Sequence, residues 1–175
     1  LARGHEVRCG TRHPGPAERA HPDRTWVRLD VEDAGSLRGA FDGADALVYL
    51  VHQMRDGSGK DLVALEEACA RRVAEAATGA GLRRIVYLGG PAPREGPPSK
   101  HLLARLRTGE ILRGGTVSAV ELRAPMIVGA GSQSWKMVRD LALRLPVMVL
   151  PAWLSRRSQP IAIDDVAAAL AAALQ

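Results

Sequence analysis

Two residues whose side chains suit acid–base and anion chemistry, His101 and Arg105, lie four positions apart in a segment of helical character at 99–112. One turn of helix separates them, so their side chains project from the same face. An imidazole can donate a proton near neutral pH, whereas a guanidinium binds phosphate or ribose oxygens and stays protonated. His101 is therefore the candidate acid of a reaction, and Arg105 is the candidate partner of a phosphate or a ribose.

A predicted strand just before this helix positions it. Residues 85–88 form an apolar run with β-branched and aromatic side chains, which Gly89 and Gly90 close. This pattern predicts a buried parallel strand. Ligands of open α/β sheets bind just outside the carboxyl ends of the strands. We therefore expect the floor of any active site at 88–91 and its wall on the helix at 99–112.

The rest of the chain alternates predicted strands with predicted helices. Strands are expected at 5–11, 25–31, 45–52, 84–89, 117–128 with a break at Pro125, 147–150 and 159–163. Helices are expected from Asp33 or Ser36 to Phe41, at 60–78, 99–112 and 132–145, and from Asp164 or Asp165 to the end, with a loop at 13–23. This alternation predicts a single α/β domain, a doubly wound parallel sheet with helices on both faces.

The composition is ordinary for a globular chain of 175 residues, with 46% hydrophobic and 25% charged residues. No apolar run approaches the ~18 residues of a membrane span, so no membrane partner is expected. Two cysteines without motif spacing, Cys9 and Cys69, indicate a reducing, cytoplasmic compartment, and neither is expected to bind a metal or to act in catalysis. The net charge of +5 comes from scattered cations without interleaved aromatics, so nucleic acid is not an expected partner.

The Gly-x-Gly-x-x-Gly fingerprint of dinucleotide-binding folds does not occur in this sequence. Residues 1–4 have the pattern of a helix end closed by Gly4, and a predicted strand follows. In a Rossmann fold, that order comes directly after the first strand and its glycine-rich loop. We therefore expect about 20–25 residues with those elements upstream of Leu1, and a chain that is truncated at both ends.

The ends of three predicted strands supply further candidates for cofactor binding. In a Rossmann frame Arg12 suits the 2′-phosphate of NADP, although a solvated loop arginine explains it equally well. Asp30 and Val31 would lie near the adenine, unless Asp30 caps the next helix. His52 ends the strand at 45–52, beside the place expected for the cofactor.

Six segments carry a resemblance to a known family. They are LARGHEVRCGTR, LDVEDAGSLRGAFDGADALVYLVH, AATGAGLRRIVYLGG, LRAPMIVGAGSQSW, LRLPVM and QPIAIDDVAAAL. Together they resemble the NAD(P)H-binding, NmrA-like branch of the atypical short-chain dehydrogenase/reductases, which includes epimerase-like proteins. The resemblance covers essentially the whole chain. It implies a Rossmann fold that binds NAD(P)H, with Gly89, Gly90 and Pro125 on the nicotinamide side.

The chain departs from this family at the catalytic pair. The classical family has Tyr-x-x-x-Lys on this helix, where the lysine lowers the pKa of the phenol and holds the nicotinamide ribose. His101 and Arg105 take those positions at the same spacing, and Gly89-Gly90 replaces the family's serine. Two functions stay open: an oxidoreductase for a small carbonyl or sugar-like substrate with His101 as the acid, and an NAD(P)H sensor without turnover. Arg12 favours NADP(H) over NAD(H), and Arg105 is also an expected cofactor contact.

Overall fold

The computed structural model describes residues 4–52, 61–92, 96–144 and 159–175. The strands of this part are β1 (Arg8–Thr11), β2 (Thr25–Arg28), β3 (Ala46–Tyr49), β4 (Arg84–Gly89), β5 (Ser118–Arg123), β6 (Ile127–Val128) and β7 (Ile161–Ala162). The helices are α1 (Pro14–Ala20), α2 (Ala34–Phe41), α3 (Leu62–Gly79), α4 (Lys100–Arg113), α5 (Gln133–Arg144) and α6 (Ile163–Ala173). Strands and helices alternate along most of the chain, as the sequence predicts.

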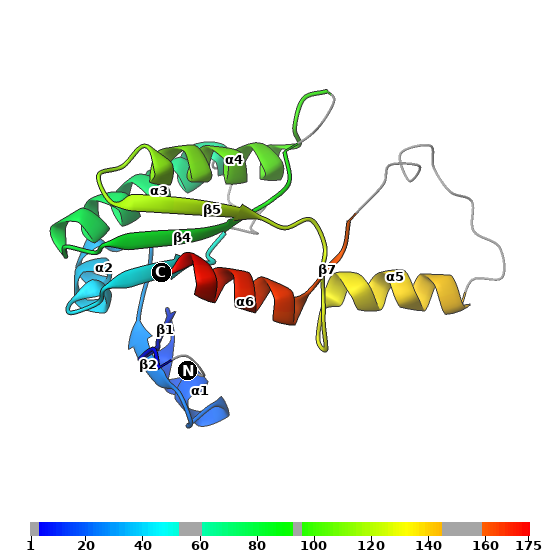
Figure 1. Ribbon diagram of the computed structural model, residues 1–175, viewed down its shortest axis with the longest axis horizontal. Coiled ribbons are helices and arrows are strands. Elements are labelled where there is room, and N and C mark those ends of the chain that lie inside the picture. The colour runs from blue at the N-terminus through cyan, green and yellow to red at the C-terminus, as the bar shows by residue number, and fades with distance from the viewer. Residues whose placement is uncertain (1–3, 53–60, 93–95, 145–158) are drawn as a thin grey trace.

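The main sheet contains β3, β4 and β5 in that order, and both of its ladders are parallel. Figure 1 shows α3 and α4 on one face of this sheet and α6 on the other. The remaining described strands pair as β1 with β2 and β6 with β7, and these ladders are parallel too. The prediction of an α/β fold with parallel strands and helices on both faces is therefore confirmed.

The central strand β4 is the most completely buried strand of the main sheet. Ile85, Val86 and Tyr87 are 1%, 0% and 2% exposed, so both faces of the strand are covered. This is why its apolar residues run continuously instead of alternating with polar ones. The core lies between the sheet and α3 with α4, where Ile85 and Tyr87 pack with Val73 and Leu112.

Three helices begin at side-chain caps that the sequence makes recognisable. Asp33 accepts hydrogen bonds from the backbone N–H groups of Gly35 and Ser36, at 2.9 and 3.2 Å, and caps α2. Asp61 caps α3 in the same way. Ser99 accepts a hydrogen bond from the Leu102 N–H at 3.3 Å and caps α4. Such caps satisfy N–H groups that have no partner inside the helix, and they fix where each helix starts.

The structure corrects three of the expected elements. The expected loop at 13–23 contains α1, because prolines fit the first turn of a helix, where an N–H has no intrahelical acceptor. The expected strand at 117–128 is two strands in separate sheets, β5 and β6. Ala162, and neither Asp164 nor Asp165, is the N-cap of α6; the two carboxylates lie in its first turn, where the helix dipole favours negative charge. The expected helix end at 1–3 and strand at 147–150 lie outside the described residues.

Two buried tyrosines differ in what their hydroxyls contact. Tyr49 and Tyr87 are register partners on β3 and β4, with ring centroids 5.8 Å apart. The Tyr87 hydroxyl donates a hydrogen bond to the backbone oxygen of Arg105 at 3.2 Å. The Tyr49 hydroxyl is buried, and no atom of the described residues bonds to it. Burial raises the pKa of both phenols, and the negative charge of Glu66 raises that of Tyr49 further.

We expect the two Tyr→Phe changes to have opposite effects on stability. Tyr49→Phe removes a buried hydroxyl without a partner and should raise the free energy of unfolding at pH 7 by about 1 kcal/mol. Tyr87→Phe removes the hydrogen bond that the hydroxyl donates to the Arg105 carbonyl, and should lower the free energy of unfolding by about 1 kcal/mol. Denaturant titrations of the two variants and the wild type measure both values. A loss of similar size in both variants would contradict the difference between the two environments.

The same tyrosines predict a loss of stability in alkali. Because their pKa values are raised in the folded state, the folded protein holds protons that the unfolded chain releases above about pH 10. Their contribution is complete below that pH and is lost as the pH rises above it. Titrations at pH 7 and pH 10.5 should therefore show a smaller alkaline loss for Tyr49→Phe than for the wild type. An equal loss would exclude Tyr49 as a source of the effect.

Candidate functional site

Arg105 of α4 is held against the carboxyl end of β4. Its Nη2 donates a hydrogen bond to the Leu88 carbonyl at 3.1 Å, and its own carbonyl accepts the Tyr87 hydroxyl at 3.2 Å. The guanidinium also lies against Gly90, where an added Cβ would come within 3.5 Å of its Cζ and Nε atoms. One hydrogen bond from the Arg105 side chain, one to its backbone carbonyl and the contact with Gly90 therefore fix this cation at the end of β4. The helix that holds Arg105 therefore lies beside residues 88–91, where the sequence predicts the floor of a site.

His101 lies in the first turn of α4, just after the Ser99 cap. Its side chain is exposed, and it lies one turn before Arg105 on the same helix. Arg105 contacts Leu88 near the carboxyl end of β4, and His101 lies one helical turn closer to the start of α4. His101 is therefore placed beyond the carboxyl end of β4. The structure therefore places the two predicted residues of the α4 face at the edge where open α/β sheets bind ligands.

The Gly89-Gly90 turn also lies next to Pro125. The backbone N–H of Ala124 donates a hydrogen bond to the Gly89 carbonyl at 3.2 Å, which extends the contact between β4 and β5. Ala124 is buried and Pro125, which follows it, is exposed. Gly89, Gly90 and Arg105 therefore lie together at the end of β4, and Pro125 directly follows the residue that bonds to Gly89.

Of the other predicted cofactor residues, His52 follows β3 of the main sheet, whereas Arg12 and Asp30 follow β1 and β2 of the separate two-stranded sheet. Arg12 follows β1 and is exposed, and His52 follows β3, with its Nδ1 atom 3.4 Å from the Leu50 carbonyl. The Asp30 carboxylate accepts the Glu32 N–H at 3.0 Å and shapes the turn after β2, whereas the cap of α2 is Asp33. Val31 is 5% exposed and its side chain belongs to the core, so only its backbone can meet a ligand.

Sequence reasoning missed one residue of this region, Glu121 on β5. Its side chain is 2% exposed and lies in a slot between β4 and α4. An added Cβ at Gly89 would lie 2.5 Å from its Oε1 atom, and one at Gly109 would lie 2.7 Å from it. The sequence carries a signal for this residue. Ala119 and Glu121 are two positions apart on β5, so both side chains point to the face that packs on α4, where a carboxylate is unexpected. A glycine inside the facing helix is the second half of that signal.

The carboxylate of Glu121 is paired on one side only. Its Oε2 atom lies 2.9 Å from Arg113 Nη1 and 3.0 Å from Arg123 Nη2. Its Oε1 atom, which lies against the two glycines, is buried and has no hydrogen-bond donor among the described residues. Glu121 therefore contacts the end of α4, the end of β5 and the last residue of β4.

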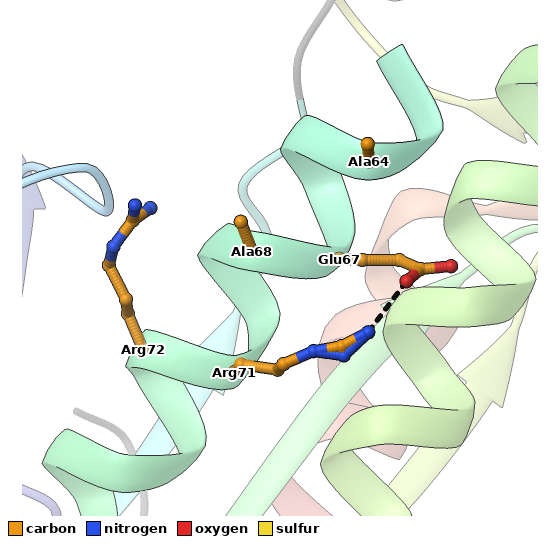
Figure 2. Close-up of a pocket in the computed structure, with 5 residues that line it drawn as sticks. All are labelled: Ala64, Glu67, Ala68, Arg71 and Arg72. Carbon is orange, nitrogen blue, oxygen red and sulfur yellow. Dashed lines mark hydrogen bonds and ion pairs between the residues drawn. The ribbon is translucent and has the colours of Figure 1, made fainter. Parts of the chain in front are cut away.

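A shallow hollow of about 410 Å³ lies along α3. Figure 2 shows its lining, in which Glu67 and Arg71 point toward the neighbouring helix and Arg72 points the opposite way. Arg71 Nη2 lies 2.7 Å from Glu67 Oε2, an ion pair across one helical turn on the surface. All of its lining residues come from α3, so we do not count the hollow as part of the strand-end site.

The described residues also bear on membrane and metal binding. No helix in the described ranges is both long enough and apolar enough to cross a membrane. Among the same residues, no group of three or more His, Cys, Asp or Glu side chains is arranged to hold a metal ion. Cys9 is half-buried and Cys69 is buried in the core, where burial raises the pKa of its thiol.

Parallel strands with helices on both faces place this chain in the class of open α/β domains, which bind ligands at the carboxyl ends of their strands. A family model described as NAD(P)H-binding matches residues 1–175. The chain belongs to this NAD(P)H-binding family. The resemblance stated from the sequence is thereby confirmed at the level of the family.

Relatives of known sequence or structure agree with this assignment. The ceramide reductase of Caulobacter vibrioides is 32% identical over 156 residues, which are 84% of this chain and 48% of that protein. The Bordetella bronchiseptica enzyme WbmG, solved with NAD, matches all of this chain and 62% of its own at 20% identity, with a TM-score of 0.76. The Citrobacter sp. triphenylmethane reductase, solved with NADP(H), matches 67% of this chain and 39% of its own at 23% identity, with a TM-score of 0.57. The two structures establish a shared fold, and the chain spans less than two thirds of each of these proteins.

Proposed function

We propose that this protein is an oxidoreductase that moves hydride between NAD(P)H and a small carbonyl or sugar-like substrate, with His101 as the proton donor. The observation that carries this proposal is the α4 face at the end of β4, where an exposed histidine lies one turn beyond a fixed arginine. The nicotinamide supplies the hydride when bound, and His101 supplies the proton to the substrate oxygen. Arg105 holds the ribose or phosphate beside Gly89 and Gly90.

A second function, dinucleotide binding without turnover, is favoured by a different observation. Arg105 occupies the place at which the classical dehydrogenases have a lysine, and its Nη2 is already bonded to the Leu88 carbonyl. An arginine fixed in this way binds anions, but because its guanidinium stays protonated it cannot pass a proton along a relay to the catalytic acid. A protein that senses the NAD(P)H level needs the first property and not the second.

The two functions are separated by His101→Ala. We expect NADPH binding to the full-length protein to be unchanged and NADPH oxidation over a panel of small carbonyl compounds to fall about 100-fold, since general acids contribute about that much. Lys100→Ala, at the neighbouring exposed position, is the matched control and should leave both quantities unchanged. Turnover that survives His101→Ala would remove His101 as the acid. NADPH binding by the wild type without turnover on any compound would favour the sensor.

We also propose that the protein prefers NADP(H), because Arg12 lies exposed directly after β1. In Arg12→Ala the NADPH affinity should fall about tenfold, the value of one charge-assisted hydrogen bond, while NADH affinity stays the same. Arg19→Ala on α1 removes the same charge from a nearby exposed site and is the control. An unchanged ratio of the two affinities in Arg12→Ala would refute the role of Arg12. Fluorescence titration with each nucleotide gives the ratio.

A further inference from the structure

The glycine slot around Glu121 is an arrangement that the proposed reaction does not use. Gly89 ends β4 and Gly109 lies inside α4, and each lacks the Cβ that would collide with the Glu121 carboxylate. Glycine in a helix interior costs stability relative to alanine, but an alanine Cβ at Gly109 would lie 2.7 Å from the Glu121 carboxylate, so the glycine is required by the buried glutamate. The helix and the strand therefore approach each other with a buried carboxylate between them, directly behind Arg105.

Resting on the proposed dinucleotide site, we propose that Glu121 is a positioning residue for that site. It sets the distance between α4 and the end of β4, and in this way it aims Arg105 and His101 at the bound dinucleotide. The side chain of Glu121 lies beneath the helix and is 2% exposed, so it does not touch the ligand itself.

The contacts of Glu121 explain how it can position Arg105 without touching the ligand. Its Oε2 atom binds Arg113 in the last turn of α4 and Arg123 at the end of β5. Its Oε1 atom lies against Gly109, one helical turn after Arg105, and against Gly89. One carboxylate therefore ties α4, β4 and β5 together just behind the two predicted ligand-binding residues of α4. A shift of α4 at Gly109 would move the Arg105 guanidinium relative to Gly90.

Removing the charge of Glu121 should change NADPH affinity in opposite directions if Glu121 positions α4 and if it acts only through its charge. A dinucleotide is an anion, so removing a nearby negative charge should strengthen its binding through Coulomb attraction. Glu121→Gln keeps the shape of the side chain and removes the charge that holds the two arginines. A loss of NADPH affinity in this variant would thus have the opposite sign to the electrostatic expectation and would point to displacement of α4.

The test is a double-mutant cycle with Glu121→Gln and Arg105→Ala in the full-length protein, with NADPH as the ligand. We expect Glu121→Gln alone to weaken NADPH binding about tenfold, within the range of coupling between connected residues. In the Arg105→Ala background the same change should have no further effect on binding. The effects of the two changes on chemical unfolding should add. Glu110→Gln removes an exposed carboxylate of α4 that pairs with Arg107, and it should leave NADPH binding unchanged.

Each outcome of this cycle decides the proposal. Equal losses of affinity from Glu121→Gln in both backgrounds, or no loss in the wild-type background, would overturn it while leaving the proposed function intact. A wild type that binds neither NADPH nor NADH would overturn the proposed function and this inference with it. If Glu121→Gln does not fold, Arg113→Met removes the half-exposed partner of the Glu121 ion pair and tests the same contact, with Arg107→Met as the control. Arg113→Met should weaken NADPH binding about threefold, and unchanged binding would again overturn the proposal.

Discussion

Replacing Gly109 by alanine is expected to lower the free energy of unfolding by about 2 kcal/mol, the net of about 3 kcal/mol of overpacking and about 1 kcal/mol of helix propensity. The new Cβ would lie 2.7 Å from both carboxylate oxygens of Glu121, which is itself buried and held by two arginines. The neighbours cannot give way easily, because the carboxylate is also packed against Gly89.

The matched control is Gly39→Ala in α2. Gly39 is exposed within a helix, and an added Cβ there meets no atom within 4 Å. Alanine should therefore raise the free energy of unfolding by about 0.7 kcal/mol through helix propensity alone. Urea titrations of both variants provide the comparison. Two changes of the same sign would show that the carboxylate does not fill the slot beside Gly109.

Arg105→Ala should weaken NADPH binding by the full-length protein about 30-fold, as expected for the loss of a charged hydrogen-bonding group that is already held in place. The guanidinium is fixed by the Leu88 carbonyl and by contact with Gly90, so it loses little freedom when a ligand binds. Arg105→Lys keeps the charge but not the planar fork, and it should recover only part of the affinity.

Arg107→Ala is the control for the loss of a cation from the same helix. Arg107 is exposed and pairs with Glu110 at 2.7 Å and with Glu67 of α3 at 4.0 Å. Its removal should leave NADPH affinity unchanged, because exposed pairs of this kind contribute little. Isothermal titration of the three variants gives the affinities. Equal losses in Arg105→Ala and Arg107→Ala would mean that net charge, and not the strand-end site, governs binding.

Much of the fold follows from local patterns in the sequence. The apolar run of β4 and its closing glycines predict a buried parallel strand with the observed bounds, 84–89. Asp33 and Ser99 mark helix starts because their side chains accept N–H groups that the helix leaves free. The α1 helix was missed because proline and glycine suggest a loop, although prolines are compatible with a first turn.

The candidate site was predicted only where one element determines it. The helical spacing of His101 and Arg105 places them on one face, and the strand before α4 places that face at a sheet edge. The slot around Glu121 depends on three elements far apart in the sequence, β4, α4 and β5. No local pattern predicts a contact among three such elements. The one indication in the sequence is a charged residue, Glu121, at a strand position that faces the core.

The most direct test of the account is a crystal structure of the full-length protein with NADPH. We predict that the nicotinamide ribose lies over Gly89 and Gly90, with one of its oxygens or a phosphate oxygen within about 3.2 Å of the Arg105 guanidinium. His101 should then face the open side of the nicotinamide, where a substrate carbonyl would lie. A nucleotide bound elsewhere on the chain, with the end of β4 in contact with solvent only, would contradict the central claim.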